Sequence, residues 1–159
     1  KMFVSRDGAR SFQPVAAVGL PADWSSAQPH WREAPSPILV TPGRSGELWF
    51  LLGGRLYRST DSGASFRAAS ASDLAITHFG LGKAAPAASA PTLFAIGKRD
   101  GLTAVWRSTD GGAKWERIND DAHQWGLRFR MLSGDPRIFG RVYVATDGRG
   151  ILYGDPAAR

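Results

Sequence analysis

One stretch decides the fold of this chain: Ser108-Thr109-Asp110-Gly111-Gly112-Ala113-Lys114-Trp115. It recurs nearly intact as Ser59-Thr60-Asp61-Ser62-Gly63-Ala64-Ser65-Phe66, and in a more divergent form as Ser5-Arg6-Asp7-Gly8-Ala9-Arg10-Ser11-Phe12. We call these three stretches the octads. Their aspartates recur at intervals of about 50 residues, which is typical of stacked supersecondary units.

Each octad predicts a tight turn between two strands. The carboxylates of Asp7, Asp61 and Asp110 can accept hydrogen bonds from the backbone N–H groups that follow them. Gly63 and Gly112 can adopt a positive φ without steric cost, and the closing Phe or Trp can start the next strand and bury a large ring. We therefore interpret the three aspartates as structural turn residues, because three copies of one turn do not make a unique active site.

The first octad departs from this pattern. Ala9 stands where the other two octads have Gly63 and Gly112. A side chain at a position that favours glycine predicts a turn that is strained or differently shaped.

The rest of the chain reads as short strands, so the predicted fold class is all-β. Leu48–Leu52 is a continuous apolar run, typical of a strand buried on both faces, and Gly53-Gly54 after it predicts a hairpin turn. No helix is predicted. Strands are expected at 2–5, 12–18, 38–41, 48–52, 55–59, 66–69, 76–82, 92–97, 104–108, 115–118, 127–133, 141–146 and 151–153.

Composition narrows the function classes. The 159 residues are 43% hydrophobic and 21% charged, as in an ordinary globular domain. The net charge of +6 comes from scattered Lys and Arg without a basic run, which argues against nucleic-acid binding. There is no Cys, so thiolate metal sites and Cys nucleophiles are excluded. No metal cluster, cofactor motif or membrane-spanning run is recognised.

The octads resemble the Asp-box, also called the BNR repeat, of sialidases, family-74 glycoside hydrolases, sortilin-type receptors and some photosystem-assembly factors. In those families the motif joins the two outer strands of a β-propeller blade. The resemblance implies four-stranded antiparallel blades: half a blade, two full blades and three strands of another. Residues 1–159 would then be the last blades of one propeller.

A second resemblance covers nearly the whole chain and points to the carboxyl-terminal region of family-74 glycoside hydrolases. That family comprises xyloglucan-cleaving endoglucanases and oligoxyloglucan reducing-end-specific cellobiohydrolases. It implies tandem seven-bladed propellers and inverting cleavage of the β-1,4-glucan backbone, with catalytic aspartates at positions that have no counterpart here. The segments that carry the resemblance are 79–86, 118–126, 134–136 and 141–156.

The candidate substrate-binding residues come from long loops. In a propeller the connections from strand two to three and from strand four to the next blade share one face, where aromatic rings can stack on sugars. For the Trp residues, packing against neighbouring blades is the alternative to sugar contact. For His123, a polar contact is favoured over a catalytic role. Asp120 and Asp121 are adjacent and would point apart, so they do not form an acid–base pair. The candidates are Trp24, Trp31, His123, Gln124 and Trp125.

The resulting hypothesis is a part of a secreted or periplasmic hydrolase that forms the wall of a xyloglucan cleft. No catalytic residue is assigned, no cofactor is expected, and the partners would be the substrate and the remaining blades. We expect the chain to need those blades, since about three cannot close a propeller. The alternative is a non-catalytic propeller that acts as a binding or assembly module.

Overall fold

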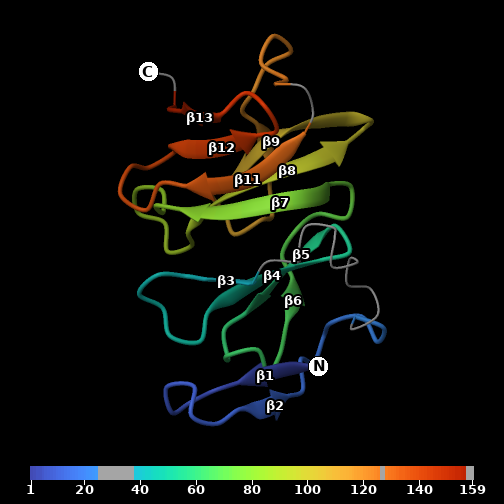
Figure 1. The fold of residues 1–159 in the computed structure, drawn as a ribbon, viewed down its shortest axis with the longest axis vertical. Helices are drawn as coiled ribbons and strands as arrows, with labels where there is room; N and C mark the ends of the chain where they lie inside the picture. Colours follow the sequence, from blue (N-terminus) through green and yellow to red (C-terminus); the bar gives the residue numbers. More distant parts are fainter. Residues whose placement is uncertain (25–37, 126–127, 157–159) are drawn as a thin grey trace. The chain divides into compact units, whose positions relative to one another are not determined.

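The computed structural model describes residues 1–24, 38–125 and 128–156 (Figure 1). The chain divides into two compact units, Lys1–Ala69 and Ser70–Arg159, which we describe separately. Within the described residues every regular element is a strand, and all ladders within the sheets are antiparallel. The prediction of an all-β fold is therefore confirmed.

The first unit contains a two-stranded and a four-stranded sheet. The pair is β1 (Met2–Val4) and β2 (Gln13–Val15), and the larger sheet runs in consecutive order through β3 (Ile38–Val40), β4 (Leu48–Leu52), β5 (Arg55–Ser59) and β6 (Arg67–Ala68). β4 lies in the middle of its sheet and is almost entirely buried, as its apolar run predicts. Gly53 and Gly54, with φ of 56° and 79°, form the hairpin turn to β5.

The second unit contains a four-stranded and a three-stranded sheet. The larger one runs through β7 (Ala75–Gly82), β8 (Thr92–Arg99), β9 (Leu102–Ser108) and β10 (Glu116–Arg117). The smaller one runs through β11 (Phe129–Gly134), β12 (Val142–Thr146) and β13 (Ile151–Gly154). Consecutive strand order in both is the arrangement predicted for propeller blades.

The two sheets of the second unit pack face to face through one apolar cluster. Its buried members are Phe94, Ile96, Val105, Leu132, Val142 and Val144. At the end of the contact, β7 and β11 approach closely through Gly80, Gly82 and Gly134. A Cβ added at Gly134 would lie 2.6 Å from the Cα of Gly82, so only glycine fits between these backbones.

The octads connect β1 to β2, β5 to β6, and β9 to β10. In each, the serine hydroxyl donates to the aspartate Oδ1 over 2.8 Å. The same Oδ1 accepts the backbone N–H four residues later, from Ser11, Ser65 and Lys114, over 2.8–3.0 Å. Each of the three carboxylates therefore binds groups of its own octad, and the purely structural role of Asp7, Asp61 and Asp110 stays a prediction.

The first octad has the same shape as the other two and carries strain. Ala9 has a φ of 68°, close to the 88° of Gly63 and the 98° of Gly112, and its N–H donates to Ser5 Oγ as in the other copies. A non-glycine residue in this left-handed region costs about 1–2 kcal/mol. Of the two alternatives that the sequence left open, strain is the one that the structure shows.

Two further expectations for this part of the chain are wrong. The strand expected over 12–18 ends at Val15, because Ala17 has a φ of 50° and Val18 instead makes an isolated parallel bridge with Ser65. The burial expected for Phe12, which closes the first octad, is also wrong, because this side chain is 61% exposed. It lies on the face of the hairpin opposite to Met2, the residue that packs on the core of this unit. The aromatic residues of the other octads, Phe66 and Trp115, are buried as expected.

Replacing Ala9 by glycine should stabilise the protein. The left-handed strain of about 1–2 kcal/mol is removed, while the greater freedom of glycine in the unfolded chain takes back about 0.4–1 kcal/mol. We expect a net gain of up to about 1.6 kcal/mol, measured by chemical denaturation. Gly63→Ala is the matched control and should lower stability, and a loss of stability in the Ala9→Gly variant would contradict the assignment of strain.

The octads should also make stability depend on pH in the acid range. Hydrogen bonds from the hydroxyl and N–H of Ser65 lower the pKa of Asp61 from 3.8 to about 2. A carboxyl group whose pKa is lower in the folded than in the unfolded protein stabilises the fold at any pH above its unfolded pKa. This stabilisation is lost as the pH falls through the pKa of the folded state, here between pH 4 and 2. Carboxyl titration by NMR should show this pKa, and Ser65→Ala should raise it toward 3.8; an unchanged pKa in that variant would contradict the proposed cause.

Candidate functional site

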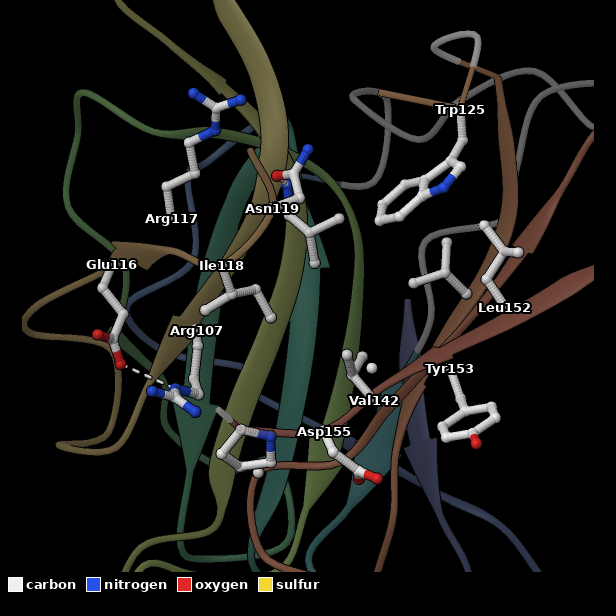
Figure 2. Close-up of a pocket in the computed structure, with 15 residues that line it drawn as sticks. Arg107, Glu116, Arg117, Ile118, Asn119, Trp125, Val142, Leu152, Tyr153 and Asp155 are labelled. Atoms are coloured by element: carbon white, nitrogen blue, oxygen red, sulfur yellow. Dashed lines mark hydrogen bonds and ion pairs between the residues drawn. The ribbon is translucent and has the colours of Figure 1, made fainter. Parts of the chain in front are cut away.

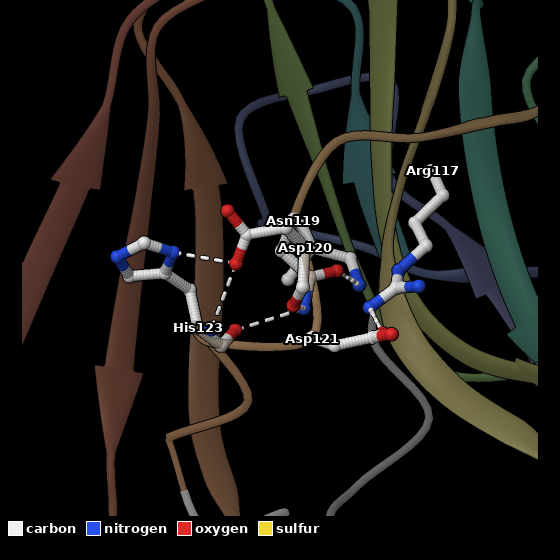
Figure 3. Close-up of polar contacts among 6 residues, drawn as sticks. Arg117, Asn119, Asp120, Asp121 and His123 are labelled. Carbon is white, nitrogen blue, oxygen red and sulfur yellow. Dashed lines mark hydrogen bonds and ion pairs between the residues drawn. The ribbon is translucent and has the colours of Figure 1, made fainter.

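The loop after β10 holds the candidates that the structure brings together. Residues 118–125 follow β10 and carry Asn119, Asp120, His123, Gln124 and Trp125. Asn119 organises the loop: its Oδ1 accepts the N–H of Val105 over 2.8 Å, and its Nδ2 donates to the carbonyl of His123 over 2.9 Å (Figure 3). The loop is therefore fastened to β9 by an amide side chain.

His123 and Asp120 form a hydrogen-bonded pair on this loop. Asp120 Oδ1 lies 2.6 Å from His123 Nδ1 and also accepts the backbone N–H of His123 over 2.9 Å (Figure 3). The bond to the His123 ring is the main reason why the pKa of Asp120 is lowered. Both side chains are exposed, so the second ring nitrogen of His123 faces solvent-accessible surface, where it can bind a hydroxyl group.

Trp125 lies beside this pair. Its ring centroid is 5.9 Å from that of His123, and it is half-buried against the apolar cluster of the second unit. The backbone of Trp125 has a φ of 45°, a conformation that is rare for a bulky residue. Such strain is often found at functional positions.

A cavity of about 280 Å³ adjoins Trp125 between the two sheets of the second unit (Figure 2). Figure 2 shows Ile118 and Asn119 on one side of it and Leu152 and Val142 on the other. The Arg107–Glu116 ion pair, at 2.8 Å, lies at its border. Its lining combines aliphatic side chains with the polar and charged side chains of Arg117, Asn119 and Asp155.

A second, more open cavity of about 400 Å³ was not predicted from the sequence. It is lined by residues of β7, β8, β9 and β11, among them His78, and by Arg128, Arg130 and Asp147. Asp147 binds Arg130 over 3.0 Å, and its N–H donates to the carbonyl of Arg128 over 3.1 Å. Burial lowers the pKa of His78. His78 stands in an alternating strand pattern, so no local signal in the sequence marks it.

The remaining candidates lie in the first unit. Trp24 packs edge-on against Phe50, with centroids 6.2 Å apart, and is partly buried on the core of that unit. Trp31 falls outside the described residues. Gln124 is partly exposed next to His123. The described residues contain no group of three or more His, Asp or Glu side chains that could hold a metal ion, and no helix of theirs could span a membrane.

Comparison with known proteins gives one consistent result. The chain is 46% identical to a Paenibacillus xyloglucanase, over 98% of this chain and 15% of that protein. It is 40% identical to the xyloglucanase Xgh74A of Acetivibrio thermocellus, over 99% of this chain and 18% of that one. The crystal structure of the GH74 enzyme of Niastella koreensis matches 74% of this chain and 17% of its own, with a TM-score of 0.66 and 38% identity.

The chain covers only a small part of the length of each relative. It spans 15–18% of the length of the curated relatives named above. No family model matches the sequence.

Proposed function

Because the chain belongs to glycoside hydrolase family 74 as one segment of such an enzyme, we propose that it forms part of a xyloglucan-cleaving hydrolase and supplies a wall of its substrate cleft. The enzyme would act outside the cytoplasm, secreted or in the periplasm, because xyloglucan is a polymer too large to enter a cell intact. Cleavage would be inverting and would use carboxyl groups contributed by other parts of the enzyme.

The loop over 119–125 is the proposed contact with sugar. The observation that carries this is the fixed triplet of Asp120, His123 and Trp125, in which an exposed imidazole is oriented by a carboxylate next to an aromatic ring. Sugar sites combine an aromatic platform with a few oriented polar groups. Gln124 would add a hydrogen-bonding amide, and Trp24 and Trp31 stay predictions for the first unit.

Trp125→Ala in the full-length hydrolase tests this role. A ring contact is worth about 0.5–1.5 kcal/mol, so we expect KM for tamarind xyloglucan to rise several-fold, up to about tenfold, with kcat nearly unchanged. His123→Ala should raise KM less, about threefold, because it removes one polar contact.

Two measurements separate sugar contact from packing. The exposed Thr60 of the second octad provides a control, since Thr60→Ala should leave KM unchanged. The melting temperature of each variant is recorded in parallel. If Trp125→Ala lowers the melting temperature while KM stays at its original value, Trp125 only packs against the core and the proposed contact is wrong.

A further inference from the structure

The chain leaves the β7–β10 sheet at Asn119. β10 ends at Arg117, and one residue later the N–H of Ile118 donates to the carbonyl of Val105 in β9 over 2.9 Å. Two residues that face each other in this way in an antiparallel pair normally exchange both of their hydrogen bonds. In a longer strand the N–H of Val105 would therefore donate to the carbonyl of Ile118.

The side chain of Asn119 accepts this second bond instead. Its Oδ1 accepts the N–H of Val105 over 2.8 Å. Val105 is buried in the core of the second unit, where an unpaired N–H group would be costly. The amide of Asn119 thus satisfies the donor in β9, while the main chain after Ile118 turns out of the sheet.

The other end of the same amide closes the loop over 119–125. Its Nδ2 donates to the carbonyl of His123 over 2.9 Å (Figure 3). One planar group therefore sets the distance between β9 and the main chain of His123, whose ring centroid lies 5.9 Å from that of Trp125. The two partners of the amide are a donor and an acceptor, so a carboxylate, which only accepts, cannot replace it.

A second bond between this loop and the sheet is weaker. Arg117 Nη2 lies 2.6 Å from Asp121 Oδ1, but the Asp121 side chain is 88% exposed. Ion pairs at such exposure contribute little, because water screens the charges and two long side chains must be ordered. The bond between Asp120 and His123 lies within the loop and does not reach the sheet. Among these bonds, those of Asn119 therefore contribute most to the position of the loop.

We propose that Asn119 is a positioning residue for substrate binding: without touching the sugar, its amide holds His123 and Trp125 in the arrangement that contacts it. The support for this amide is rigid, because β9 lies between β8 and β10 inside the sheet. Side chains that are held in place beforehand lose less freedom when a ligand binds. This inference rests on the proposed contact of the loop with sugar and adds the residue that prepares the loop for it.

Asn119→Asp in the full-length hydrolase tests this role. The substitution keeps the shape of the side chain and the acceptor for Val105, but its second oxygen cannot donate to the carbonyl of His123. We expect KM for tamarind xyloglucan to rise about fivefold with kcat nearly unchanged, since the contact groups remain but are no longer held in place. Thr92→Val is the matched control. It removes the bond from Thr92 Oγ1 to the carbonyl of Lys83 at the opposite end of the same sheet and should leave KM unchanged.

Two further measurements show whether Asn119 acts through the two rings. In the background of His123→Ala and Trp125→Ala, Asn119→Asp should change KM less than about 1.5-fold, because the effects of residues that act through one another do not add. Without substrate, amide exchange over 118–125 should become at least about tenfold faster in the Asn119→Asp enzyme, because the loop opens locally more often.

The outcomes that contradict the proposal differ from those that contradict the sugar contact. If Trp125→Ala raises KM and Asn119→Asp does not, the sugar contact stands and Asn119 does not position it. If Asn119→Asp raises KM by the same factor with and without the two rings, or leaves amide exchange over 118–125 unchanged, Asn119 does not act through this loop. If removal of both rings leaves KM at its original value, the sugar contact itself is wrong and the role of Asn119 falls with it.

Discussion

Gly134→Ala is expected to destabilise the protein by about 3 kcal/mol, a large part of the 5–15 kcal/mol that stabilises a typical domain. The added Cβ would lie 2.6 Å from the Cα of Gly82 and 2.8 Å from the ring of Phe94. The contact with Gly82 is between backbones and cannot be relieved by a side-chain rotation, so β7 and β11 must separate. Overpacking of this kind costs about 1–3 kcal/mol and sometimes more, which corresponds to a fall of about 6–12 °C in melting temperature.

Gly154→Ala is the matched control for this prediction. Gly154 also lies in a strand of the same sheet, but an added Cβ there would be 3.9 Å from its nearest neighbour, Val142 Cγ1. Its effect should be within about 0.5 kcal/mol. Calorimetry of the two variants gives the comparison, and equal melting temperatures would show that the two sheets can move apart freely at Gly134.

The 159-residue chain alone is expected to release no reducing sugar from xyloglucan above the buffer background. Inverting hydrolysis needs two carboxyl groups about 6.5–9.5 Å apart across the scissile bond. Several carboxylates are already engaged within the chain. Asp61 and Asp110 bind groups of their octads, and Asp135 accepts two backbone N–H groups and the hydroxyl of Tyr143.

The control for this experiment is the full-length hydrolase, assayed on the same tamarind xyloglucan. Asp120 is an exposed carboxylate that lies 2.6 Å from the ring of His123. If the isolated chain does turn over substrate, and Asp120→Asn abolishes that turnover, then a catalytic carboxyl lies within this segment and our assignment of none is wrong.

Most of the fold could be predicted because its signals are local. Paired glycines mark the β4–β5 turn, and the three octads mark the turns β1–β2, β5–β6 and β9–β10. The prediction was least accurate where one residue decides the turn. Strands are expected over 92–97 and 104–108, but Asp100 adopts a φ of 50° beside Gly101. A two-residue turn therefore suffices, and the strands extend until Arg99 pairs with Leu102.

The site was harder to predict than the fold. The loop residues His123, Gln124 and Trp125 stand out in the sequence by their residue types alone. The structure adds that Asp120 and Asn119 hold His123. The two cavities could not be predicted, because each is lined by several segments that only the packing of two sheets brings together. Their lining residues, such as His78 and Leu152, belong to ordinary strand patterns.

The octads also have a consequence for the order of events in folding. In each one, the serine, the aspartate and the backbone groups that they bind lie within seven consecutive residues, so the turn can close before any distant contact exists. Closing a short loop takes far less time than pairing distant strands. The three octads can therefore act as independent nucleation points at intervals along the chain. Each brings together the two strands that it connects, and the slower association of the sheets follows.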